Sequence, residues 1–267
     1  MSPGWRTRLA SASRVTDAAA MPEVTLTLAI AFVFLAAIVR GYAGFGFSLL
    51  AVVSLSLLMP PETFVPSIFV MEIAASIHML PGLWRAIHWR SLMSLIAGCI
   101  VGTPFGVWLL ASVPAPPMQV ALAVFVLIVT GLLWLDFSWK AMPHPAAATA
   151  IGAASGLLNG AFGIGGPPVI LFYFASPAGH IAGRASLIAY FMLTDMIGLA
   201  FMLRQGLITT SIVTQSLLFL PALVAGVWIG GRSFRNADPA AFRRHVLLLL
   251  AGLAVLTGIR GLALAGS

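Results

Sequence analysis

A glycine- and proline-rich stretch at residues 159–168 carries the strongest chemical signal in the chain. It reads Asn-Gly-Ala-Phe-Gly-Ile-Gly-Gly-Pro-Pro, and apolar residues run from Ala146 up to it and from Val169 to Ala175 after it. Glycine loosens a helix, and proline removes a backbone donor and clashes with the preceding turn, so we predict a break in a membrane helix here. At membrane depth such a break persists only if it is buried in protein or lines a wet cavity.

A weaker copy of this stretch lies at residues 40–46, with the sequence Arg-Gly-Tyr-Ala-Gly-Phe-Gly. Two interrupted apolar segments at corresponding places in two halves predict a transporter binding site. A helix that begins just after Gly165 or Gly166 would direct its unpaired N–H groups and partial positive charge at that site, and Pro167 suits its first turn. This arrangement favours a small anion. The alternative, that the glycines only allow close helix packing, stays open.

Two arginines stand next to the predicted breaks. Arg40 directly precedes the first one, and Arg184 opens the apolar span after the second. A guanidinium is a natural bidentate partner for a sulfonate, sulfite or carboxylate, although both arginines could instead anchor helix ends at the membrane interface. The full set of predicted substrate-binding residues is Arg40, Gly41, Gly44, Gly46, Asn159, Gly160, Gly163, Gly165, Gly166, Pro167 and Arg184.

Two acidic residues lie deep inside apolar runs, at similar places in the two halves. They are Glu72 and Asp195. An intramembrane carboxylate is costly and is a functional hypothesis by default, so we name both as candidates for coupling transport to protons. The alternative is a neutral or paired acid that fixes helix packing.

The composition indicates an all-α polytopic membrane protein. The chain is 60% hydrophobic and 8% charged, whereas a soluble domain carries roughly 25% charge. The net charge of +7 does not indicate nucleic acid, because the basic residues are scattered at the ends of apolar runs, where they determine topology. The single cysteine, Cys99, excludes a disulfide within the chain, and we expect no metal and no cofactor.

We do not expect an enzyme. Ser155-Gly156 faintly resembles a serine protease motif, but no histidine lies at similar depth in a later span, since His180 is in a turn and His245 is at a span end. Paired carboxylates, metal-ligand spacing and phosphate loops are also missing from the sequence.

The apolar runs predict about 8 to 10 membrane-embedded helices in two homologous halves. We divide the chain into a disordered N-terminal tail (1–22), a first membrane repeat (23–139), a linker (140–145) and a second membrane repeat (146–265). Met21 offers a second plausible start just before the first apolar run.

An internal duplication explains the order of the runs. Gly41, Gly44 and Gly46 match glycines 119 residues later, and Gly106-Val107-Trp108 matches a Gly-Val-Trp 120 residues later. The basic turn at 85–90 and the basic loop at 232–244 mark the cytoplasmic side, which predicts inverted halves whose breaks meet near the midplane. The arginines at positions 6, 8 and 14 count against this orientation.

Taken together, these motifs resemble the TauE/SafE family of sulfite and organosulfonate exporters. Residues 156–160 and 163–169 resemble its second-half signature and residues 40–51 its first-half signature, with support from residues 88–91, 102–106 and 242–244. One departure is Phe47, which stands where a fuller glycine run often continues. The substrate across the family is diverse, so sulfite itself does not follow.

The resemblance implies a multi-pass permease of the bacterial inner membrane that moves small sulfur-containing or carboxylated anions. The expected partners are therefore a small anion and the lipid bilayer, with no nucleic acid, and a homodimer is left open. We expect a secondary transporter, working outward. The alternatives are an anion channel and a membrane scaffold or assembly protein that transports nothing.

Overall fold

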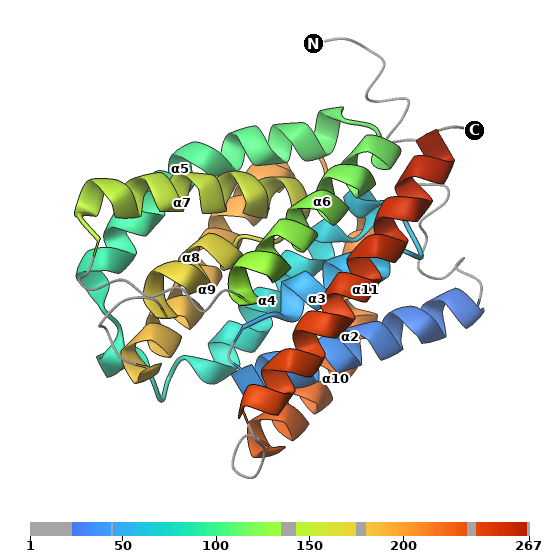
Figure 1. The fold of residues 1–267 in the computed structure, drawn as a ribbon. Helices are drawn as coiled ribbons and strands as arrows, with labels where there is room; N and C mark the ends of the chain where they lie inside the picture. The colour runs from blue at the N-terminus through green and yellow to red at the C-terminus, as the bar shows by residue number, and fades with distance from the viewer. Residues whose placement is uncertain (1–22, 44, 135–142, 175–179, 234–238, 266–267) are drawn as a thin grey trace.

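The computed structural model describes residues 23–43, 45–134, 143–174, 180–233 and 239–265 (Figure 1). The predictions for the tail, Met21, Gly44 and residues 140–142 of the linker lie outside these ranges. Within them, the chain forms helices and no strand, which confirms the all-α class. The first half contains α2 (Glu23–Ala43), α3 (Phe47–Leu55), η1 (Pro61–Thr63), α4 (Val65–Met79), η2 (Trp84–Ala86), α5 (Trp89–Ser112) and α6 (Ala115–Trp134). The second half contains α7 (Pro145–Phe162), α8 (Gly166–Phe174), α9 (His180–Arg204), α10 (Thr210–Ser233) and α11 (Pro239–Ala265).

Four of the described helices, α2, α5, α9 and α10, are long and apolar enough to cross a membrane. Their outer faces carry large apolar side chains that are more than half exposed, such as Phe105 and Trp108 on α5 and Val224 and Trp228 on α10. Water would disfavour such faces and lipid would accept them. The chain is therefore a multi-pass membrane protein.

The principal helix pairs each join the first half of the chain to the second. Helix α2 packs along α10, α5 along α7, α4 against α9, and α6 along α11, with α5 and α7 on one side of the molecule and α11 on another (Figure 1). The two halves are thus interleaved, and neither forms a separate bundle.

Glycines bring α5 and α7 into close contact. They recur every fourth residue on both helices: Gly98, Gly102 and Gly106 on α5, and Gly152, Gly156 and Gly160 on α7. A Cβ placed on Gly156 would lie 2.6 Å from the Cys99 carbonyl oxygen, so no larger residue fits. Gly98 lies against Thr149 and Gly106 against Leu157, which means that the helices run in the same direction. Small residues let membrane helices approach until their backbones touch.

The same kind of contact joins α2 to α10. Gly41 lies against Val227, and Gly230 lies against Ile38. In the other pair, Gly160 lies against Val107, so the two contacts match at an offset of 119 or 120 residues.

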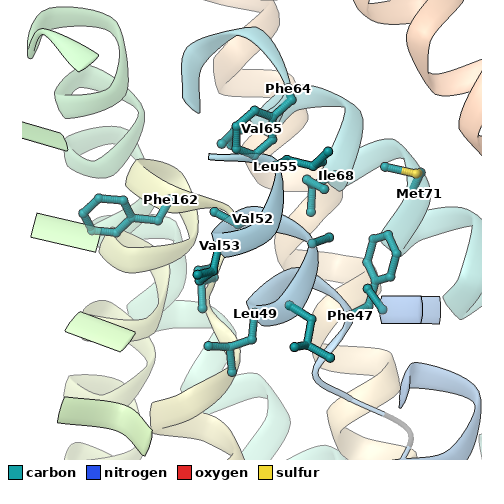
Figure 2. Close-up of a cluster of buried hydrophobic side chains, with 14 of the residues drawn as sticks. Phe47, Leu49, Val52, Val53, Leu55, Phe64, Val65, Ile68, Met71 and Phe162 are labelled. Atoms are coloured by element: carbon teal, nitrogen blue, oxygen red, sulfur yellow. The ribbon is translucent and has the colours of Figure 1, made fainter. Parts of the chain in front are cut away.

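Helix α3 lies at the centre of the larger hydrophobic core. All nine of its residues are buried. Figure 2 shows its side chains together with Phe64, which directly precedes α4, with Val65 and Ile68 of α4, and with Phe162 of α7. A helix this short and fully buried must satisfy its terminal backbone groups through other elements.

The helical run stops at both glycine-rich stretches, but over fewer residues than the sequence predicts. Helix α7 continues through Asn159 and Gly160 to Phe162, and α8 begins at Gly166, as expected. Helix α2 likewise continues through Gly41. The prediction that Gly41 and Gly160 belong to the breaks is wrong, because these glycines keep helical geometry and lie in helix–helix contacts. Within the described residues of the two stretches, positive φ angles fall at Gly46 (+90°) and Gly163 (+69°).

Candidate functional site

A buried ion pair joins the first break to α4. Arg40, in the last turn of α2, has no exposed surface, and its Nη2 lies 2.9 Å from Oε2 of Glu72. The same nitrogen donates a hydrogen bond to Ser76 Oγ at 3.0 Å. The other carboxylate oxygen, Oε1, accepts a hydrogen bond from the backbone N–H of Ser48 at 3.3 Å. Because Ser48 is in the first turn of α3, the Glu72 carboxylate lies at the positive end of that helix.

The donors of Arg40 are only partly used. Its Nε and Nη1 are buried and have no hydrogen-bond partner among the described residues. Its guanidinium carbon lies 5.1 Å from the centre of the Phe191 ring, an attractive cation–π contact that leaves N–H donors unpaired. Unpaired donors on a buried cation are costly, so this guanidinium has the capacity to bind a further acceptor.

The second break has an equivalent cluster. Asn159 Nδ2 donates to Asp195 Oδ1 at 2.8 Å, and Asn159 Oδ1 accepts from the Gly165 backbone N–H at 3.1 Å. Asp195 is buried, and its Oδ2 has no hydrogen-bond partner among the described residues. The backbone N–H of Gly165, a predicted substrate-binding residue, is therefore occupied by the Asn159 side chain.

The two clusters correspond by position and lie within electrostatic reach of each other. Arg40 and Asn159 each precede the first glycine of a stretch, and each binds the acid of the second α-helix after its break, which is α4 in the first half and α9 in the second. The side chains of Glu72 and Arg40 are close enough to Asp195 to interact with it electrostatically, and Arg40 is also close enough to interact with Arg184. The charged residues predicted from the sequence thus meet in one region of the molecule.

A further pair of hydroxyl groups fixes the second break. Tyr190 donates to Ser155 Oγ at 2.9 Å, and Ser155 in turn donates to the Gly165 carbonyl oxygen. Ser155 is therefore committed to a backbone contact. Together with Asn159, it holds both backbone groups of Gly165.

The predicted glycines fall into different roles. Gly41 and Gly160 lie in helix–helix contacts, whereas Gly46 precedes α3 with a left-handed backbone. A Cβ on Gly163 would lie 3.3 Å from the Val65 side chain, and one on Gly166 would lie 3.3 Å from the Phe191 ring. Pro167 follows Gly166 in the first turn of α8.

Sequence reasoning did not single out several polar residues of these clusters, namely Ser48, Ser76 and Tyr190. Ser48 had a usable signal, because it follows the first break directly. Ser76 lies one helical turn after Glu72, so a search for polar residues on that face of α4 would have found it.

Comparison with known proteins decides the family. The sequence profile described as "Sulfite exporter TauE/SafE" matches residues 29–257. The chain belongs to the TauE/SafE family. It is also similar to a "Probable sulfite/organosulfonate exporter TauE" of Cupriavidus necator, with 26% identity over 217 residues that cover 79% of this chain and 84% of that protein. No solved structure matches the chain.

Membership in the TauE/SafE family confirms the resemblance that the glycine motifs indicate. It makes the chain a membrane transporter of the exporter kind, which accords with the many apolar helices. The matched range includes the Arg40–Glu72 pair and the Asn159–Asp195 pair, so both clusters belong to the family domain.

Proposed function

We propose that this protein is a secondary transporter that exports small anions, such as sulfite or organosulfonates, across the bacterial inner membrane. The family match and the name of the Cupriavidus necator relative support this class of substrate. The observation that carries the proposal is the fully buried Arg40, whose Nε and Nη1 have no hydrogen-bond partner among the described residues and whose ion-pair partner Glu72 lies at the N-terminus of α3. A guanidinium and a helix N-terminus are both suited to an oxyanion.

We further propose that the two halves are inverted repeats that open alternately around this region. Two matching parallel pairs, α2 with α10 and α5 with α7, support a two-fold relation between the halves. Helices α6 and α11, the last of each half, contact each other in opposite directions, because Ala123 lies against Gly258 and Val120 against Gly261. Equivalent helices that pack antiparallel favour inversion over a parallel duplication.

The alternatives are a channel and a scaffold that transports nothing. The buried, charged clusters favour transport, because a scaffold gains nothing from a cation with unpaired donors in its core. A channel would need a continuous polar path, whereas the described side chains around α3 form a closed apolar core.

A flux measurement tests the proposal. Purified protein is reconstituted into vesicles, and uptake of labelled sulfite and of labelled sulfoacetate is measured against concentration. We expect saturable uptake, which Arg40→Gln abolishes. Arg204→Gln, which changes an exposed arginine at the end of α9, should leave uptake unchanged. Uptake that never saturates would indicate a channel, and no uptake of either anion by folded protein would refute this substrate class.

A further inference from the structure

The Glu72 carboxylate lies among hydrogen-bond donors and positive charge that favour an anion. It accepts from the first turn of α3 through Ser48 N–H and pairs with the guanidinium of Arg40. Gly46 at the start of α3 offers no side chain that could cap this turn. This inference rests on the proposed function. We propose that the Glu72 carboxylate occupies the binding position of the transported anion, and that protonation of Glu72 releases the Arg40 and Ser48 donors so that one anion can bind there.

The first argument is chemical equivalence. A carboxylate and a sulfonate both present oxygens that accept from a guanidinium and from backbone N–H groups. In the present state these donors hold an oxygen anion that belongs to the protein itself. An external anion can use the same donors only if the Glu72 carboxylate leaves them.

The second argument is the number of donors. A guanidinium has five N–H groups, and Arg40 uses only Nη2 for Glu72 and Ser76. Nε and Nη1 remain buried and, within the part of the chain that the structure describes, without hydrogen-bond partners. A sulfonate, with three oxygens, could accept from the donors that Glu72 now holds and from those that it leaves unpaired.

The third argument is charge balance. Arg40 pairs with Glu72 and lies within electrostatic reach of both Asp195 and Arg184, and the formal charges of these four side chains sum to zero when all are ionised. Adding an anion would leave one negative charge in excess in a buried region, which is costly. A proton on Glu72 restores the balance, so one proton accompanies one monovalent anion.

The surroundings of Glu72 contain few other titratable groups. The helix α3 has none, and the charged group of α10 is Arg232, in the last turn, where it lies over the Trp228 ring. On α4 itself the other titratable residue is His78 in the last turn, and η1 contributes Glu62. Helix α9 contributes Asp195, which accepts from the Asn159 amide, together with Arg184 and Tyr190, and α2 contributes Arg40. Glu62 of η1 lies outside the group of four charges, so the same change of a carboxyl group to an amide there provides a matched control.

The experiment measures anion binding against pH. The probe is 2-hydroxyethanesulfonate, a permanently ionised monoanion, titrated calorimetrically into the detergent-solubilised full chain. For the unmodified protein we expect the affinity to fall by up to about tenfold per pH unit as the pH rises, because each anion binds together with one proton. Glu72→Gln should bind with no dependence on pH, and Glu62→Gln, which makes the same change outside the group of four charges, should keep the slope of the unmodified protein.

The outcomes separate the inference from the proposed function. If the unmodified protein binds, but Glu72→Gln keeps the slope or loses binding, the inference is overturned and the transport proposal stands. If no variant binds at any pH although all are folded, both fail. A second measurement needs no variant: in weakly buffered solution near neutral pH, each anion that binds should take up about one proton. Binding without proton uptake would overturn the inference.

Discussion

At the scale of residues, the two halves place different chemistry in equivalent positions. Arg40 meets Glu72 in the first half, and Asn159 meets Asp195 in the second. The first cluster is charged and has unpaired cationic donors, whereas the second is organised by a neutral amide that also holds Gly165. The asymmetry is the reason why we propose the first cluster as the anion-binding site, whereas the second holds the backbone of its break through Asn159.

The bridging role of Asn159 leads to the first prediction. Asn159→Ala removes both the donor to Asp195 and the acceptor for Gly165 N–H, and leaves two buried polar groups unpaired. Each costs about 1–3 kcal/mol, so we expect a clear fall in the thermal unfolding midpoint in detergent. Thr149→Ala, which removes an exposed bond one turn from the start of the same helix, is the control and should change it little. Equal midpoints would show that the bridge does not stabilise the break.

The sequence was informative about which residues matter here and uninformative about how they pair. Charged residues inside apolar runs are conspicuous, so Arg40, Glu72 and Asp195 could be picked out from type and place alone. That Glu72 bonds to the Ser48 N–H depends on how α4 packs beside α3, a tertiary contact that no local pattern encodes. For the same reason the sequence could not show that a side chain occupies the Gly165 N–H.

At the scale of elements, α3 is held at both ends by polar groups of other helices. Its N-terminal turn meets Glu72, and at the other end the Ser56 carbonyl accepts from Gln119 Nε2 and Arg260 Nη1, each at 3.1 Å. Thr257 donates to the Val53 carbonyl. A negative charge at the start and a positive charge at the end both suit the helix dipole.

Removing the charge at the end of α3 is the second prediction. Arg260→Met keeps most of the apolar stem and loses the donor to Ser56, and the lost interaction is worth about 0.5–2 kcal/mol. We expect a lower unfolding midpoint in detergent. Arg204→Met serves as the control, because Arg204 is exposed. A midpoint that falls equally in both variants would attribute the effect to loss of charge in general.

The close contact of α5 with α7 gives the third prediction. In Gly156→Ala, the added methyl group would lie 2.6 Å from the Cys99 carbonyl oxygen, and the helices must separate to admit it. Such overpacking costs about 1–3 kcal/mol, so the unfolding midpoint should fall. Gly131→Ala on α6 has nothing within 4 Å of the new methyl group and should be neutral or stabilising, since alanine favours the helix. Equal unfolding midpoints for the two variants would show that the contact between α5 and α7 tolerates a larger residue at position 156.

Glycines also explain why the extent of the two breaks could not be predicted correctly from the sequence. The helix positions follow the apolar runs closely, because a membrane helix must be long and apolar. Gly41 and Gly160, however, were read as parts of the breaks, while they lie in helices whose neighbours come within backbone contact. A glycine that breaks a helix and a glycine that admits a neighbour look the same in a sequence, and only the partner helix distinguishes them.

At the scale of the whole molecule, the helix that leads into each break packs against a helix of the other half. Helix α2, which carries Arg40, is packed on α10 of the second half, and α7, which carries Asn159, is packed on α5 of the first. A movement of either pair therefore shifts one side of the charged region relative to the other. The proposed alternating access would use this pairing through motion of the paired helices, and that proposal includes oppositely oriented halves.

The orientation of the halves gives the last prediction. The turn between α4 and α5 and the turn between α9 and α10 are equivalent, so inverted halves place them on opposite sides of the membrane. We expect Gly82→Cys, in the first turn, to react with a membrane-impermeant thiol reagent only after cells are permeabilised, because the basic residues nearby mark the cytoplasmic side. Gln205→Cys, in the second turn, should react in intact cells. The native Cys99 is buried and gives a low background. A parallel duplication would place both cysteines on the same side, and equal labelling in intact cells would therefore refute inversion and the access mechanism that depends on it.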